Sequence, residues 1–185
     1  MTVDVAPSVE GQIVAVEASA QMLAEARRRL DDARHPVPLL QGDAFQLPFT
    51  AAFDLVYVFR LIRHFRAHER LALYRQIARV LRPGGLLVFD AVNEPVSAPI
   101  RERAEAGEFE HYDWLTRPDL LVAELAEAGL DIVSLEGVQR RYNVLARIRN
   151  LVAPRSRAVA RLAIELTDRL GGGRPLEWIV TCRRA

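Results

Sequence analysis

Two acidic residues follow predicted strands, at positions where they could bind a nucleoside. Glu17 ends an apolar, β-branched run, and Asp43 lies within Gly42-Asp43-Ala44 after a second apolar run. In open parallel sheets, ligands sit at the carboxyl ends of the strands. There Glu17 could accept hydrogen bonds from both hydroxyls of a ribose, while Asp43 and the Ala44 N–H could together bind one adenine edge. Local roles remain open, because Glu17 could favour the dipole of a following helix and Asp43 could make a turn.

His64 is a candidate general base within the stretch Phe59-Arg60-Leu61-Ile62-Arg63-His64-Phe65. The unperturbed pKa of histidine lies near neutrality, so its imidazole can accept a proton under physiological conditions. A helix-capping or packing role is the alternative. Cys182 is the only cysteine, which excludes an internal disulfide and gives no cysteine cluster for a metal.

These residues need a scaffold, and the hydrophobic pattern predicts strands that alternate with helices. Ser19 and Thr116 are placed to cap two of the helices. The alternation is typical of an α/β fold with a parallel sheet. The final strand has no helix after it, so we expect it to run antiparallel at or near the edge. The predicted strands are residues 12–16, 37–41, 54–59, 86–92, 130–135 and 176–182, and the predicted helices are 20–33, 67–81 and 117–128.

Three blocks resemble, in order and spacing, the class I S-adenosylmethionine-dependent methyltransferases. The resemblance covers residues 12–92 well and the remainder only in layout. It implies a Rossmann-like, mostly parallel sheet with helices on both faces, and S-adenosyl-L-methionine as the cofactor. The blocks are Ile13-Val14-Ala15-Val16-Glu17, then Gln41-Gly42-Asp43-Ala44-Phe45-Gln46-Leu47-Pro48-Phe49 with Phe53-Asp54-Leu55-Val56, and Val80-Leu81-Arg82-Pro83-Gly84-Gly85-Leu86-Leu87-Val88-Phe89-Asp90.

The resemblance assigns a set of residues to the cofactor site. Glu17 would bind the ribose, Asp43 and Ala44 would bind the adenine, and Ala18 would belong to the same site. Ser19-Ala20-Gln21-Met22-Leu23 resembles the family's Ser-Pro-x-Met-Leu. Met22 could therefore pack against the adenine, although a core methionine is an equal alternative.

A second set of residues would border the transferred methyl group. Phe59 follows a strand, and His64 matches the second of two histidines that many family members carry, with Arg63 in place of the first. Asp90 and Asn93 end a later strand and could touch a substrate. Methyl transfer from a sulfonium to a good nucleophile needs mainly proximity and orientation, so the reaction does not strictly require a base.

The family's glycine-rich loop is missing from the start of the sequence. Family members carry a strand, an acidic residue, Gly-x-Gly-x-Gly and a helix before the position of Ile13. Seven residues separate Val5 from Ile13, fewer than the dozen that a parallel crossover needs. The family's first strand and helix therefore cannot both be present, and the middle of the sheet is lost. Three explanations compete: a truncated reading of a longer gene, a degenerate paralogue, or a strand rebuilt from residues 2–6.

Two long segments interrupt the alternation. Residues 93–115 predict a short helix and a loop, and residues 139–175 predict a helix from about Val144 to Leu170 that is broken at Pro154. We expect both segments to form a substrate lid. Residues 139–170 hold eight arginines against two acids. A solvated helix face is the expected explanation, and nucleic-acid binding is the alternative.

The composition is that of one ordinary globular domain. The 185 residues are 50% hydrophobic and 26% charged, with a net charge of +1, which argues against a strongly charged partner such as nucleic acid. No apolar run reaches membrane-spanning length and no signal pattern opens the chain. We therefore predict a single cytoplasmic domain, residues 1–185, without membrane insertion and with residues 1–11 irregular.

The sequence favours an S-adenosylmethionine-dependent methyltransferase that acts on a small molecule. The alternative is a non-catalytic binding or regulatory module derived from the same fold. A nicotinamide-dependent Rossmann enzyme is a weaker third reading, because its glycine fingerprint is missing too. Loss of the first helix predicts weak cofactor binding and an uncovered apolar surface, hence self-association.

Overall fold

The computed structural model describes residues 11–32, 37–102, 113–140, 144, 148–152, 154–169 and 172–185. The chain divides into two compact units, Met1–Phe49 and Thr50–Ala185, and each unit is described by itself. The expected single domain stays a prediction. Residues 1–10, where most of the irregular segment and the possible rebuilt strand would lie, fall outside the described residues.

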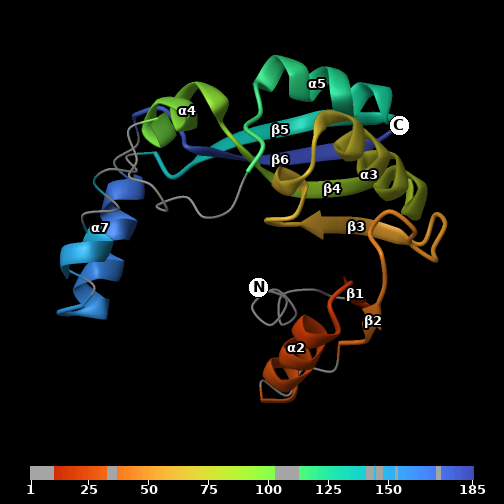
Figure 1. The fold of residues 1–185 in the computed structure, drawn as a ribbon, viewed down its shortest axis with the longest axis horizontal. Helices are drawn as coiled ribbons and strands as arrows, with labels where there is room; N and C mark the ends of the chain where they lie inside the picture. Colours follow the sequence, from red (N-terminus) through yellow and green to blue (C-terminus); the bar gives the residue numbers. More distant parts are fainter. Residues whose placement is uncertain are drawn as a thin grey trace. The chain divides into compact units, whose positions relative to one another are not determined.

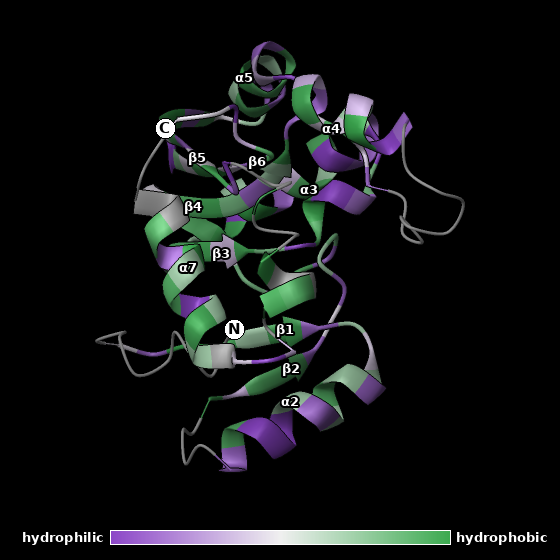
Figure 2. Ribbon diagram, turned by 90° about the vertical axis from the view of Figure 1, so that its left-hand side faces the viewer, coloured by the Kyte–Doolittle hydropathy of each residue, from purple (hydrophilic) through white to green (hydrophobic). Residues whose placement is uncertain are grey.

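The first unit contains a small parallel pair of strands and one helix. Strand β1 (Ala15–Glu17) pairs with β2 (Leu39–Gln41), and Glu17 lies opposite Gln41. Helix α2 (Ala20–Asp32) begins as predicted, because the Ser19 Oγ accepts a hydrogen bond of 3.3 Å from the Met22 N–H. Hydrophilic and hydrophobic stretches alternate along α2 (Figure 2), and Leu23 and Leu30 are its buried side chains.

The second unit is built on a four-stranded mixed sheet in the order β3-β4-β6-β5. Strands β3 and β4 pair in parallel, whereas β6 runs antiparallel to both β4 and β5. Three strands therefore share one direction, and the last strand opposes them one place from the edge, as predicted. The strands are β3 (Phe53–Val58), β4 (Leu81–Val92), β5 (Leu130–Val138) and β6 (Glu177–Arg184).

Helices α3 and α5 pack against each other and against this sheet (Figure 1). Their shared core contains Tyr74, whose ring centroid lies 5.6 Å from that of Phe89. Phe89, Val180 and Cys182 are fully buried on neighbouring strands. The helical elements of this unit are η2 (Ile62–His64), α3 (Ala67–Val80), α4 (Glu94–Glu102), α5 (Pro118–Glu127), η3 (Ile148–Val152) and α7 (Arg157–Arg169).

Two local predictions are corrected. The four residues left between the predicted helix 67–81 and the predicted strand 86–92 are a bulge inside a longer β4, between the pairs Phe53–Leu81 and Leu55–Leu86. Gly84 has a φ of 76° there, which favours glycine. The expected cap residue of α5 is also wrong. Arg117 is the N-cap, because Thr116 is engaged in a bridge to Asn93.

The sheet expected from the family is in two separate pieces within the described residues. Strand β1 ends one piece and β3 ends the other. The α/β class, the parallel pairs and the antiparallel last strand are confirmed.

Candidate functional site

The two predicted cofactor-binding acids lie at the carboxyl ends of neighbouring strands. The Glu17 backbone carbonyl accepts a hydrogen bond of 3.2 Å from the Gly42 N–H, which joins the two strand ends. Glu17 Oε1 accepts a bond of 2.9 Å from the Ser19 N–H. Asp43 Oδ1 accepts one of 2.9 Å from the Phe45 N–H. One oxygen of each carboxylate thus holds a local turn, and the other is the oxygen that a ligand would use.

The remaining residues assigned to the cofactor lie close to these acids in the sequence. The Ala18 carbonyl accepts a bond of 3.1 Å from Gln41 Nε2, which ties the residue after β1 to the end of β2. Met22 is 56% exposed, so the alternative of a core methionine is wrong. Ala44 follows Asp43 in a turn. A Cβ at Gly42 would lie 3.1 Å from Val16 Cγ1, so the strand ends approach closely where the glycine stands.

The described residues of the first unit fit the adenosine half of S-adenosylmethionine. Two carboxylates at adjacent strand ends suit a ribose diol and an adenine amino group, and an exposed thioether suits an adenine face. The glycine loop that would bind the methionine carboxylate has no counterpart in the sequence. The described residues therefore fit the adenosine part of the cofactor and not its methionine part.

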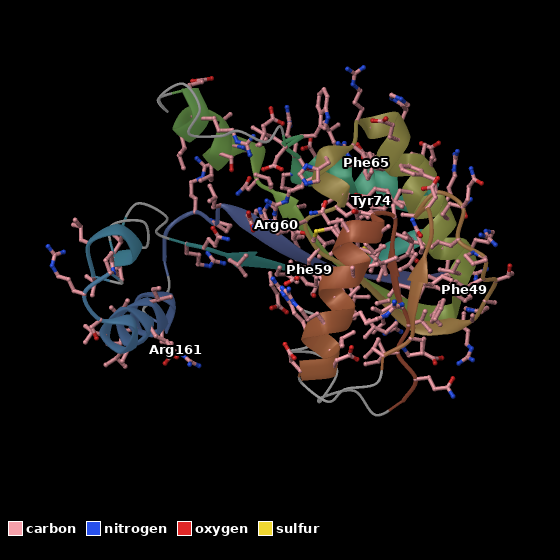
Figure 3. All side chains as sticks on the ribbon, turned by 60° about the horizontal axis from the view of Figure 1, so that its bottom comes forward. Phe49, Phe59, Arg60, Phe65, Tyr74 and Arg161 are labelled. Carbon is pink, nitrogen blue, oxygen red and sulfur yellow. The ribbon has the colours of Figure 1, made fainter. Side chains whose placement is uncertain are left out.

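The predicted methyl-bordering residues lie in the second unit, in the turn after β3. Phe59 and Arg60 leave the end of this strand (Figure 3). Arg60 has a φ of 59°, in the left-handed region that non-glycine residues rarely adopt. Its N–H donates a hydrogen bond of 2.6 Å to Asp90 Oδ1. The end of β4 thus holds the turn in a strained conformation.

Arg63 is the centre of a buried ionic cluster below this turn. Its side chain is 7% exposed, it bonds to Asp90, and it lies 3.0 Å from Glu177 Oε1 and 3.7 Å from Asp113 Oδ2. Burial by itself lowers the pKa of Arg63, but the negative charges of Glu177, Asp90 and Asp113 raise it above the ordinary value. The guanidinium stays charged and joins η2 to β4, β6 and the segment after α4.

His64 lies at the edge of the same cluster, with its side chain 40% exposed. Its Nδ1 is 3.6 Å from Asp113 Oδ1. Asp113 is 16% exposed and also pairs with Arg101 at 2.9 Å. A partly exposed imidazole with a carboxylate on one nitrogen is an arrangement suited to proton transfer.

Asp90 and Asn93 hold the structure together, contrary to the expectation that they touch a substrate. Asp90 is 3% exposed and Asn93 is 4% exposed. Asp90 binds Arg60 and Arg63, and Asn93 Nδ2 donates a bond of 2.6 Å to the Pro175 carbonyl. Both side chains are committed to protein partners, so they act on the site through other residues.

Sequence reasoning missed the roles of Asp113 and Glu177 altogether. Nothing in their local sequence distinguishes them, because their partner Arg63 is more than 45 residues away from each. Arg63 itself offered one signal, as an arginine inside an apolar stretch. Among the described residues, no three or more His, Cys, Asp or Glu side chains are arranged so that they could hold a metal ion. None of the described helices is long and apolar enough to cross a bilayer.

Sequence comparisons point to methyltransferases. Residues 1–85 match the family model described as a methyltransferase domain. The chain is 31% identical over 93 residues to the demethylmenaquinone methyltransferase of Staphylococcus saprophyticus, covering 50% of this chain and 39% of that protein. It is 32% identical over 104 residues to the ubiquinone/menaquinone biosynthesis C-methyltransferase of Coxiella burnetii, covering 55% and 41%. The match thus spans about two fifths of each of these relatives.

Solved structures share the fold over nearly the whole chain. The magnesium protoporphyrin IX methyltransferase of Synechocystis, solved with bound S-adenosylhomocysteine, gives a TM-score of 0.69 at 12% identity, covering 100% of this chain and 68% of that one. The cyclase SpnF gives a TM-score of 0.66 at 23% identity, covering 99% and 69%. At these identities the likeness concerns the fold.

Proposed function

We propose that this chain, a relative of the class I S-adenosylmethionine-dependent methyltransferases, binds S-adenosylmethionine and methylates a small aromatic acceptor at carbon. The proposal rests chiefly on Glu17 and Asp43. Both lie at neighbouring strand ends, and both fall inside the 85 residues that match the methyltransferase family model. The names of the curated relatives, which are quinone-pathway methyltransferases, suggest the acceptor.

The first unit would hold the adenosine part of the cofactor. Glu17 would accept hydrogen bonds from the ribose hydroxyls, and Asp43 would accept one from the adenine amino group, with the Ala44 N–H donating to a ring nitrogen. Ala18 and Met22 would offer apolar contacts to the same nucleoside. When bound, S-adenosylmethionine would supply an electrophilic methyl group on a positively charged sulfur.

The second unit would prepare the acceptor. A quinone ring carbon is electron-poor, whereas a reduced quinol becomes nucleophilic at carbon when a neighbouring hydroxyl loses its proton. His64 would accept that hydroxyl proton, and Phe59 would pack against the acceptor ring. The proton on the methylated carbon leaves afterwards, which restores the aromatic ring. The segments 93–115 and 139–175, parts of which lie outside the described residues, would cover the acceptor as a lid.

The test separates cofactor binding from catalysis. S-adenosylhomocysteine titrated by calorimetry should bind weakly, in the high-micromolar to millimolar range of about 4–6 kcal/mol, because the methionine carboxylate lacks its glycine loop. With radiolabelled S-adenosylmethionine and reduced demethylmenaquinone, labelled methyl should appear on the naphthoquinone ring. His64→Gln should slow that transfer and leave the S-adenosylhomocysteine affinity unchanged. Absence of methyl transfer would refute the proposal, whether or not S-adenosylhomocysteine binds.

A non-catalytic module of the same fold is the second candidate. A fold of this kind also occurs in a cyclase, SpnF, so the fold alone does not dictate methyl transfer. Measurable cofactor binding with no transfer to any quinol would support this candidate. A cytoplasmic location, self-association and the absence of a nucleic-acid partner stay predictions.

A further inference from the structure

Asp113 is the residue that meets His64 and the buried cluster at once. One of its oxygens, Oδ1, lies 3.6 Å from His64 Nδ1. The other, Oδ2, lies 2.9 Å from Arg101 Nη2 and 3.7 Å from Arg63 Nη1. The carboxylate is thus held on one side by two arginines and presents its second oxygen to the imidazole.

The backbone next to Asp113 is fixed to the same turn. The Trp114 N–H donates a hydrogen bond of 2.6 Å to the Arg63 carbonyl. The Arg66 guanidinium lies 5.6 Å from the centroid of the Trp114 indole ring, within cation–π range. These contacts hold Asp113 beside His64 independently of any contact that His64 itself makes.

We propose that Asp113 is a positioning residue that fixes the tautomer and orientation of His64. The inference rests on the proposed function of His64 for its catalytic meaning, although its geometry does not. A carboxylate beside Nδ1 favours the tautomer in which that nitrogen carries the proton, and the second ring nitrogen then has the lone pair that accepts a proton. The separation of 3.6 Å exceeds a hydrogen bond, as contacts of catalytic residues often do before substrate binds.

The charges around Asp113 explain why its carboxylate remains available to a histidine. The carboxylates of Asp90, Asp113 and Glu177 face the guanidinium of Arg63, and Asp113 also faces that of Arg101. Arg63 bonds to Asp90 and lies closer to Glu177 than to Asp113. These two acids are therefore the nearer partners of Arg63, both at its Nη2, and Oδ1 of Asp113 faces the imidazole.

Nitrogen-15 NMR of the histidine side chains tests the inference without any substrate. At a pH where His64 is neutral, the wild-type protein should show mainly the Nδ1–H tautomer. Asp113→Ala should shift the ring mainly to the Nε2–H form, which free histidine prefers in water, and Asp113→Asn should give an intermediate result with less structural disturbance. Asp119→Asn is the matched control, because that exposed acid pairs only with Arg117 among the described contacts and should leave His64 unchanged.

Activity then gives a second, separable readout. Asp113→Asn should lower kcat for the quinol acceptor by about 10²-fold, the lower range of what a general base contributes, and leave the KM for S-adenosylmethionine unchanged. A wild-type protein without methyl transfer would refute the proposed function, and the tautomer measurement would still decide the role of Asp113. An unchanged tautomer in both Asp113 variants would overturn the inference, whatever the activity.

Discussion

Replacing Arg63 with methionine tests the buried cluster most directly. The side chains of Arg63 and Asp90 are 7% and 4% exposed, so the change leaves the Asp90 carboxylate in the interior without its cation. Glu177, at 17% exposed, loses the same partner. Breaking one side of a buried ion pair costs about 3–5 kcal/mol, because the remaining charge is stranded. We expect Arg63→Met to lower the free energy of unfolding by about 3–5 kcal/mol, which corresponds to a fall in Tm of about 6–20 °C.

The control is an ion pair on the surface of the same unit. Arg82 pairs with Asp54 at 2.7 Å, but their side chains are 53% and 79% exposed. Exposed pairs contribute about 0–1 kcal/mol, so Arg82→Met should change stability little. Both variants replace an arginine with methionine, so the difference between their free energies of unfolding measures the effect of burying the ion pair.

Urea unfolding followed by circular dichroism gives the measurement. The midpoint of Arg63→Met should move to lower urea with little change in slope. Adding Asp90→Asn to Arg63→Met should recover part of the loss, since it removes the stranded charge. A loss below about 1 kcal/mol for Arg63→Met, equal to that of Arg82→Met, would refute the conclusion that Arg63 holds the buried ionic cluster together.

Three other outcomes are expected from the same structure. Burial, and then the charge of Asp131, raises the pKa of Cys182 from its ordinary value of 9.0 to about 12, so the native thiol should resist Ellman's reagent at pH 8. The free energy of unfolding should fall as the pH rises above about 9, because the thiol of the unfolded chain loses its proton first. Asp43→Ala should weaken S-adenosylhomocysteine binding by about 1.5–3 kcal/mol in calorimetry, whereas an alanine at exposed Asp31 should not. Leu162 on α7 is 58% exposed, and Leu162→Arg should reduce any self-association seen by analytical ultracentrifugation.

Much of the fold could be predicted because hydrophobic periodicity is a local property. The helix after Ser19 begins with its predicted cap, and α3 (Ala67–Val80) matches the predicted range within a residue. Thr116 shows the limit of this reasoning. Its type and position suit a helix cap, but a long-range bridge to Asn93 engages it, and no local pattern reveals such a pairing.

The candidate functional site also has a part that the local sequence predicts and a part that it does not. Glu17 and Asp43 could be placed at strand ends from the local sequence, because Glu17 is the last residue of β1 and Asp43 comes two residues after β2. The cluster around Arg63 could not be predicted, since its carboxylates come from β4, β6 and the segment after α4. The expectation that Asp90 touches a substrate was wrong for this reason. Asp90 does lie near the end of β4, but its carboxylate accepts a hydrogen bond from the buried guanidinium of Arg63.

The separate pairing of β1 with β2 has a thermodynamic consequence. Within the described residues no ladder of hydrogen bonds joins this pair to the four-stranded sheet, and two strands alone are marginally stable. The pair should therefore open locally at a lower free energy than the larger sheet, which hydrogen exchange can resolve. Because Glu17 and Asp43 belong to this segment, a nucleoside ligand would bind its ordered form. The apparent affinity for the nucleoside then depends on the fraction of molecules in which β1 and β2 are paired, as well as on the contacts that Glu17 and Asp43 make. Bound ligand should also slow hydrogen exchange of the β1 and β2 amides.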